Sequence, residues 1–217
     1  MPLPLLQLAL DNTSLADALV STRLLAAEVD VLEAGTILIA AEGMQSVRCL
    51  RALYPNHLVA ADIKVADAGS VLAEMSYDNG ANWMTVICNA PIATVESAMS
   101  IAKKRENCDV QIELFGNWSW EDASAWRKAG ITQAIYHRGR DAQAAGQSWS
   151  EEDLGKIRRL ADMGFALSVT GGLTPEELSL FKGIPVKVFI AGRSMRDAEN
   201  PAAAAREFKA AIAKLWG

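Results

Sequence analysis

The residues with the clearest chemical potential in this sequence form the pattern Asp62-x-Lys64-x-x-Asp67. The pattern follows the apolar run 58–61, which has the composition of a buried strand. Successive strand side chains alternate between faces, so we expect Asp62 and Lys64 to point the same way. Burying charge is costly unless the charge is paired or used. The stretch therefore predicts either a structural ion pair at a strand end or a charged catalytic site.

The composition describes a chain that can build a large core. Its 217 residues are 51% hydrophobic and carry a net charge of −5 at pH 7. The length fits one α/β domain over residues 1–217, since barrels of this class are often single domains. The acidic balance argues against nucleic acid as the main partner, because phosphate backbones select basic surfaces. A local site for one small phosphate remains compatible with it.

The cysteines and the N-terminal residues indicate in which cellular compartment the protein is expected. Cys49, Cys88 and Cys108 are odd in number and lack metal-ligand spacing, which indicates reduced thiols. Residues 1–4 lack the basic region of a signal peptide. No apolar run approaches the ~18 residues of a membrane span. We therefore expect a cytoplasmic protein that does not insert into membranes.

Strand-like and helix-like segments alternate along the chain. The expected strands cover residues 5–10, 29–32, 58–67, 83–88, 109–114, 133–136, 165–170 and 186–191. Expected helices begin at Ser14, Met44, Ala68, Ile92, Ser119, Ser150 and Thr174, and a last one runs through 204–215. This alternation predicts parallel βαβ units. The number of strands and the length favour a single eight-stranded β/α (TIM) barrel over a doubly wound sheet. No Gly-x-Gly-x-x-Gly follows the first strand, which argues against nicotinamide or flavin.

In such a barrel the site lies at the carboxyl ends of the strands. Those ends carry Asp11, Glu33, Asp62 with Lys64, Glu113, His137 and Thr170. Each residue alone could be a helix cap or a loop charge. Because the fold would gather all of them at one mouth, the set favours an enzyme over a structural ion pair.

The last two strands are followed by Gly171-Gly172 and by Gly192-Arg193-Ser194. Barrels often bind phosphate at these two loops through backbone N–H groups. Arg193 adds a charge-assisted pair of donors. Glycine also serves tight turns, which is the alternative interpretation, but two such loops with an arginine favour a phosphate site.

Glu33 and Asp62 are hard oxygen ligands that suit Mg²⁺, which usually takes one or two protein carboxylates. No His/Cys cluster suggests zinc. His137 stands at a strand end beside Arg138 and Arg140, a setting that favours catalysis over packing.

Together with these residues, Asp62-x-Lys64-x-x-Asp67 at the end of a third strand resembles the signature of the orotidine monophosphate decarboxylase superfamily. The segment from His137 to Arg140, with Thr170, resembles its 3-keto-L-gulonate 6-phosphate decarboxylase branch. The resemblance runs over nearly the whole chain, from 7–12 to 215–217. One departure is the segment 103–108, which looks slightly longer than in the family and precedes the fifth strand on the face away from the site.

The resemblance implies a Mg²⁺-dependent decarboxylation of 3-keto-L-gulonate 6-phosphate to L-xylulose 5-phosphate and CO₂ through an enediolate. The pathway implied is L-ascorbate or related sugar-acid catabolism. Glu33 and Asp62 would bind Mg²⁺, while Asp67 and Glu113 would keep Lys64 charged and oriented beside the enediolate.

The same resemblance implies roles for the remaining residues. His137 and Arg140 would position or supply the proton donor. The residues implied in binding substrate and its phosphate are Asp11, Thr170, Gly171, Gly172, Gly192 and Arg193. It also implies a homodimer with shared active sites, each completed by the Asp67 region of the partner subunit.

The nearest alternative is a hexulose 6-phosphate synthase-type aldolase, which shares the fold, Mg²⁺ and the enediolate but adds formaldehyde instead of a proton. Arg140 argues against it, because a proton-delivery residue has no purpose there. A non-catalytic sugar-phosphate binding protein would not need the acid–lysine array. A ribulose-phosphate-type epimerase would require paired catalytic aspartates and histidine metal ligands, which these strand ends lack.

Overall fold

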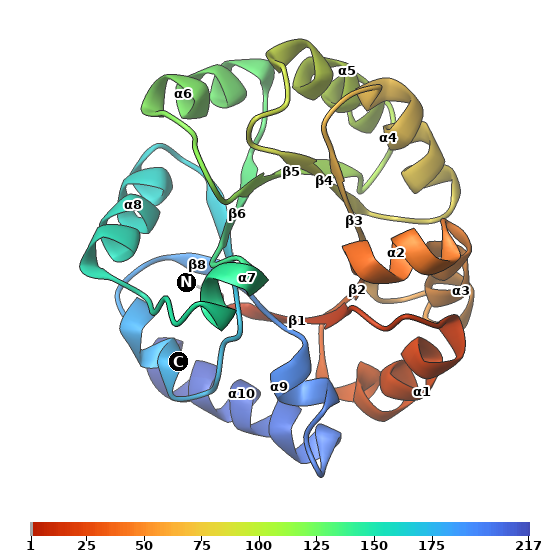
Figure 1. Ribbon diagram of the computed structural model, residues 1–217, viewed down its shortest axis with the longest axis vertical. Helices are drawn as coiled ribbons and strands as arrows, with labels where there is room; N and C mark the ends of the chain where they lie inside the picture. Colours follow the sequence, from red (N-terminus) through yellow and green to blue (C-terminus); the bar gives the residue numbers. More distant parts are fainter. Residues whose placement is uncertain (1) are drawn as a thin grey trace.

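The computed structural model describes residues 2–217, which form a closed barrel of eight parallel strands inside a ring of helices (Figure 1). The strand order follows the sequence, and the last strand pairs with the first. The strands are β1 (Leu5–Leu10), β2 (Val31–Ala34), β3 (Leu58–Val65), β4 (Trp83–Ile87), β5 (Asp109–Leu114), β6 (Gln133–His137), β7 (Ala166–Thr170) and β8 (Val186–Ala191). The predicted TIM-barrel fold is confirmed.

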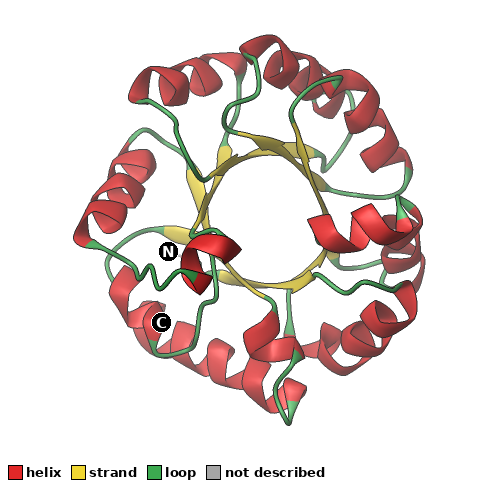
Figure 2. Cartoon of the chain, viewed as in Figure 1, coloured by secondary structure: helices red, strands yellow, loops and turns green. Residues whose placement is uncertain are grey.

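Helices surround these strands on the outside (Figure 2). In residues 2–217 they are α1 (Leu15–Leu25), η1 (Ala26–Glu28), α2 (Thr36–Glu42), α3 (Gln45–Leu53), α4 (Gly69–Asp78), α5 (Ile92–Ala102), α6 (Trp120–Ala129), α7 (Arg140–Ala144), α8 (Glu151–Asp162), η2 (Glu177–Phe181), α9 (Arg193–Arg196) and α10 (Pro201–Trp216). The short helix α7 lies inside the ring, over the barrel opening (Figure 1). Ser119 and Ser150 begin α6 and α8 with capping boxes, as expected from their sequences.

Several elements differ from the predictions. α2, α7 and α9 were not predicted, and β2 begins at Val31 and extends through Ala34, so that Glu33 lies within the strand. The sequence of α2, Thr36-Ile37-Leu38-Ile39, is apolar and β-branched and fits a strand as well as a helix. The residues after Thr174 form only the 3₁₀ helix η2, although Thr174 and Glu177 exchange the two capping hydrogen bonds.

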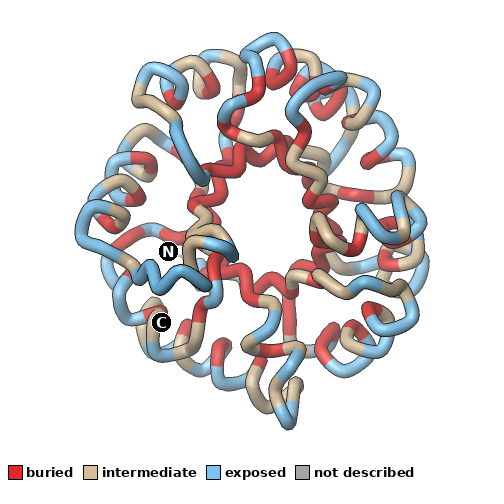
Figure 3. The backbone as a smooth tube through the Cα atoms, viewed as in Figure 1, coloured by how far each residue is buried: buried red, intermediate tan, exposed pale blue. Residues whose placement is uncertain are grey.

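Side chains along each strand point alternately toward the surrounding helices and toward the barrel interior, which gives two buried layers. Leu6, Leu8 and Leu10 of β1 are fully buried in the core between the strands and the helices. Gln7 and Ala9, between them, face the barrel interior and line its cavity. The deeper interior is filled by a small apolar cluster: Val31, Ala60, Trp83, Ile135, Val188 and Ile190. Figure 3 shows the buried residues as a continuous inner ring, so the side chains at the strand ends stand on a rigid base.

Candidate active site

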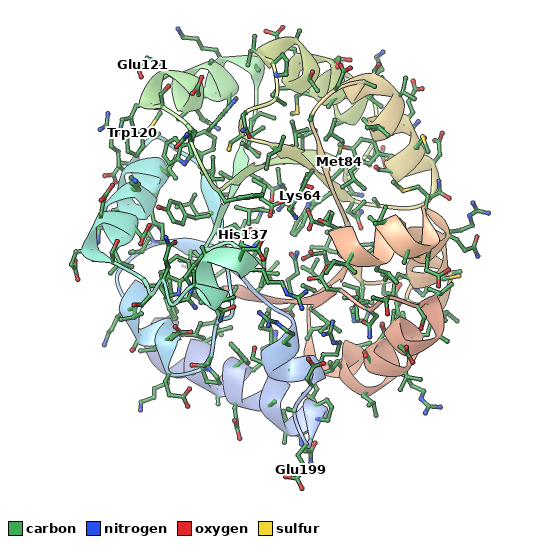
Figure 4. The ribbon with its side chains drawn as sticks, viewed as in Figure 1. Lys64, Met84, Trp120, Glu121, His137 and Glu199 are labelled. Carbon is green, nitrogen blue, oxygen red and sulfur yellow. The ribbon has the colours of Figure 1, made fainter. Side chains whose placement is uncertain are left out.

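A cavity of about 590 Å³ opens at the carboxyl ends of the strands. Every predicted site residue except Asp67 lines it, namely Asp11, Glu33, Asp62, Lys64, Glu113, His137, Arg140, Thr170, Gly171, Gly172, Gly192 and Arg193. Lys64 of β3 and His137 of β6 lie close together at the barrel mouth (Figure 4). The fold thus brings together residues that lie far apart in the sequence.

Lys64 is surrounded by oxygen atoms. Its ammonium forms an ion pair with Asp62, lies 3.0 Å from Oε2 of Glu113, and donates to Oγ1 of Thr36 at 2.8 Å. Burial alone would lower the pKa of Lys64, but the charges of Asp62 and Glu113 outweigh it and raise that pKa. Burial would likewise raise the pKa of Asp62, yet the charge of Lys64 holds it below its usual value. The pair is therefore ionised at neutral pH.

The prediction that Asp62 and Lys64 would meet was correct, but regular alternation does not explain the contact. Lys64 has a φ of 45°, in the left-handed region that lysine rarely adopts. The pairing of β3 with β4 also changes register between Ala61 and Val65. The chain is thus irregular at the residue whose ammonium enters the cavity.

Glu113 connects Lys64 to His137. Its Oε1 lies 2.5 Å from Nδ1 of His137, and its side chain is only 3% exposed. Burial, and then the charge of Asp62, raise the pKa of Glu113. The ring of Phe115 packs edge-on against His137 at a centroid distance of 5.4 Å. Because Nδ1 is taken by Glu113, the other ring nitrogen of His137 is left to meet a substrate or a water molecule.

Glu33 sits among other carboxylates. It is buried, and its Oε2 accepts from Nε2 of Gln7 at 2.5 Å. Burial, followed by the charges of Asp62 and Asp11, raises the pKa of Glu33 well above its usual value. In the described part of the chain, residues 2–217, no group of three or more His, Cys, Asp or Glu side chains is arranged to hold a metal ion.

The two glycine loops lie side by side and are bridged by Gln143 of α7. In the loop after β8, Nη2 of Arg193 donates a hydrogen bond to Oε1 of Gln143 at 2.9 Å. In the loop after β7, the amide of Gln143 packs against Gly172, and a Cβ atom on Gly172 would overlap this amide. Gly172 has a φ of 61°, so both conformation and space require glycine there. Arg138 supports the same loop by donating twice to the carbonyl of Gly171, at 3.0 and 2.6 Å.

The predicted residue Asp67 does not join this set. It is exposed just beyond β3 and is not among the residues that line the cavity. Conversely, sequence reasoning missed several polar residues that contact the predicted ones, among them Thr36, Thr85 and Gln143. Each is a common polar residue with no local signal, and only its contacts across the fold mark it.

A closed β/α barrel whose mouth gathers a lysine, several carboxylates and a histidine has the architecture of an enzyme that acts on a small molecule. The chain belongs to the orotidine 5'-phosphate decarboxylase / HUMPS family, whose sequence profile matches residues 4–208. None of the helices in residues 2–217 combines the length and apolarity that a bilayer crossing needs.

Individual relatives are more specific. The chain is 58% identical over 217 residues, 100% of both chains, to "3-keto-L-gulonate-6-phosphate decarboxylase UlaD" of Salmonella paratyphi B. It superposes with a TM-score of 0.98 and 45% identity, over 100% of both chains, on a crystal structure of KGPDC from Streptococcus mutans. A 3-hexulose-6-phosphate synthase from Salmonella typhimurium is less similar, with 26% identity and a TM-score of 0.90 over 97% of this chain and 99% of the other. The resemblance to the decarboxylase branch is confirmed.

Proposed function

We propose that this protein decarboxylates 3-keto-L-gulonate 6-phosphate to L-xylulose 5-phosphate and CO₂ in L-ascorbate or related sugar-acid catabolism. The observation that carries the proposal is the position of Lys64 between Asp62 and Glu113 at the mouth of the barrel. Full-length similarity to the Salmonella decarboxylase supports the choice of substrate.

The charge of Lys64 suits this reaction. Loss of CO₂ from a β-keto acid leaves an electron pair that spreads onto the neighbouring carbonyl as an enediolate. A fixed cation beside the developing negative charge stabilises the transition state more than the ground state. Asp62 and Glu113 keep Lys64 protonated by raising its pKa. They also hold its ammonium in place before the substrate binds.

Mg²⁺ fits the carboxylates that lie beside Lys64 in the cavity. Glu33 and Asp62 both line the cavity, and the pKa of Glu33 is raised by burial and then by the charges of Asp62 and Asp11, a repulsion that a divalent cation would relieve. Oδ1 of Asp62 accepts a hydrogen bond from Thr85, and a carboxylate oxygen with one such bond has room for a further ligand. Hard oxygen donors of this kind suit Mg²⁺. When bound there, the ion would act as a Lewis acid on substrate oxygens.

His137 and Arg140 are assigned to the proton that the enediolate carbon must take up. Glu113 fixes the ring of His137 through Nδ1, which directs the other nitrogen away from Glu113. Arg140 begins α7 and also lines the cavity. Together they would hold a water molecule that donates the proton, or donate it directly.

The glycine loops are assigned to the phosphate. Gly171 and Gly172 follow β7, and Gly192 and Arg193 follow β8. Backbone N–H groups and the Arg193 guanidinium are suitable donors for a phosphate dianion. Asp11 and Thr170, also in the cavity lining, are assigned to the substrate hydroxyls.

The proposal includes a cytoplasmic homodimer in which residues 1–217 form one catalytic domain. Asp67 lies outside the cavity lined by its own chain, although the family signature includes it. A contribution of Asp67 to Lys64 would therefore come across a dimer interface.

The test is CO₂ release from 3-keto-L-gulonate 6-phosphate, with Mg²⁺ or with EDTA, for the wild type and for Lys64→Ala. We expect release that requires both the metal and Lys64. Absence of release by the wild type, with consumption of formaldehyde and ribulose 5-phosphate instead, would place the protein with the aldolases. In that case the roles given to His137 and Arg140 would be wrong.

A further inference from the structure

The backbone at Lys64 is held in an unusual conformation. Its φ of 45° places a lysine in the left-handed region, and the pairing of β3 with β4 is irregular around it. Non-glycine residues in this region cost free energy and persist only where their surroundings hold them. The irregularity also removes the N–H group of Lys64 from the regular β-ladder, so this donor needs another partner.

That partner is Thr85 on the neighbouring strand β4. The backbone N–H of Lys64 donates to Oγ1 of Thr85 at 2.8 Å. The Thr85 hydroxyl in turn donates to Oδ1 of Asp62 at 2.8 Å. Thr85 is 1% exposed, so its hydroxyl is shielded from bulk water. A single hydroxyl therefore joins the strained backbone of Lys64 to the carboxylate that binds the Lys64 ammonium.

Thr36 makes the complementary connection from the other side. Its hydroxyl accepts from Nζ of Lys64 at 2.8 Å and donates to Oδ2 of Asp62 at 2.7 Å. Thr36 thus contacts the end of the Lys64 side chain, whereas Thr85 contacts its backbone. Both ends of Lys64 are tied to the same carboxylate.

We propose that Thr85 is a positioning residue: it holds the left-handed backbone at Lys64 and thereby places the ammonium for the reaction. The role requires a group that accepts one hydrogen bond and donates another, which a hydroxyl does and an aliphatic side chain of the same shape does not. This inference rests on the proposed decarboxylase function, because it assigns Thr85 to the placement of the charge that stabilises the enediolate.

The first experiment compares Thr85→Val, Thr85→Ala and Thr85→Ser in Mg²⁺-dependent CO₂ release. Loss of a hydrogen bond to a charged group corresponds to about a ten- to hundredfold fall in kcat. We expect this fall for the Thr85→Val and Thr85→Ala variants. KM should change far less, since Thr85 is placed to act on Lys64 rather than on the substrate. Thr85→Ser keeps both hydrogen bonds and should retain most of the activity.

A matched control is Thr22→Val. Thr22 is also fully buried, and its hydroxyl donates to the carbonyl of Ala18 within α1, away from the cavity. We expect this variant to lower thermal stability without lowering kcat. A similar loss of kcat in Thr22→Val would mean that general loosening of the fold explains the Thr85 variants.

The second experiment repeats Thr85→Val and Thr85→Ala in a Lys64→Ala background. If Thr85 acts through Lys64, its substitution should cost almost no further activity there. An undiminished additional loss would overturn the proposal, as would wild-type kcat in a folded Thr85→Val or Thr85→Ala protein. Should Thr85→Val fail to fold, the Ala and Ser variants still give the comparison.

A crystal structure of Thr85→Ala separates this inference from the proposed function. We expect the backbone of Lys64 to leave the left-handed region or its ammonium to move away from Asp62. An unchanged Lys64 would reject the positioning role even if the enzyme is a decarboxylase. Conversely, a wild-type protein that releases no CO₂ would reject the proposed function. Even then, a displaced Lys64 in the Thr85→Ala crystal structure would show that Thr85 holds Lys64 in position.

Discussion

Oε1 of Glu113 lies 2.5 Å from Nδ1 of His137 inside the barrel mouth. The other carboxylate oxygen lies 3.0 Å from Nζ of Lys64. One buried carboxylate thereby orients both the cation assigned to the enediolate and the ring assigned to the proton. Because the two groups share Glu113, we expect a change at this residue to affect both steps.

The first prediction concerns Glu113→Gln. An amide cannot accept from both Lys64 and His137 while remaining satisfied, so kcat should fall about ten- to hundredfold, the range for a lost bond to a charged partner. Steady-state CO₂ release measures it. Glu28→Gln removes a carboxylate that pairs with Arg206 far from the cavity and should leave kcat unchanged. Near-wild-type kcat for Glu113→Gln would show that Lys64 and His137 do not depend on Glu113.

The second prediction uses two glycines that share a positive φ of almost the same value. Gly172 has a φ of 61° and packs against Gln143, whereas Gly43 has a φ of 62° and would meet no atom within 4 Å of an added Cβ. Each Gly→Ala change should cost about 1–3 kcal/mol of unfolding free energy through backbone strain. Only Gly172→Ala should also raise KM severalfold, because it displaces Gln143 and disturbs the phosphate loops. Equal KM values would place the substrate phosphate elsewhere.

The third prediction concerns stability in EDTA. Burial and the charges of Asp62 and Asp11 raise the folded-state pKa of Glu33, whereas the unfolded value is about 4.3. The folded chain therefore binds the proton of the Glu33 carboxyl more tightly than the unfolded chain does. The contribution of Glu33 to the free energy of unfolding is then fully present below about pH 4.3. It is lost as pH rises through the folded-state pKa. Urea unfolding at several pH values should show this loss in the wild type and a smaller one in Glu33→Gln.

Mg²⁺ should counteract that loss. If Glu33 is a ligand, the ion would bind its ionised form, so binding would release a proton and strengthen with pH. The Mg²⁺-induced rise in melting temperature should therefore increase with pH in the wild type and be much smaller in Glu33→Gln. Asp62 cannot cause such a trend, since its pKa is lowered and its contribution is lost only toward acidic pH. A Mg²⁺ effect that is independent of pH and of Glu33 would rule out this carboxylate as a ligand.

The fourth prediction tests the shared site. In a homodimer whose sites combine Lys64 of one subunit with Asp67 of the other, we expect the Lys64→Ala and Asp67→Ala proteins each to keep only a small residual activity. Mixing them after reversible dissociation forms heterodimers with one intact site, which should restore about a quarter of wild-type activity at equal amounts. Mixing without any recovery, despite demonstrated subunit exchange, would mean that Asp67 serves the Lys64 of its own chain.

The fold and the members of the candidate site follow largely from local sequence. Alternation of apolar strands with capped helices predicts the barrel, and Ser119 and Ser150 begin their helices because a cap is satisfied by residues three positions away. Once the fold is a barrel, the residues at the carboxyl ends of all strands lie at the same mouth. That constraint placed Glu113, His137 and Thr170 together from strand ends alone.

Only the tertiary structure decided how these residues are held. α2 is helical although its sequence also fits a strand, because the closed barrel leaves no further strand position for it. The left-handed backbone of Lys64 depends on Thr85, which lies on another strand. Gln143 bridges two loops that follow different strands. Local sequence specifies hydrogen bonds between near neighbours, whereas these contacts join residues that only the closed barrel brings within reach.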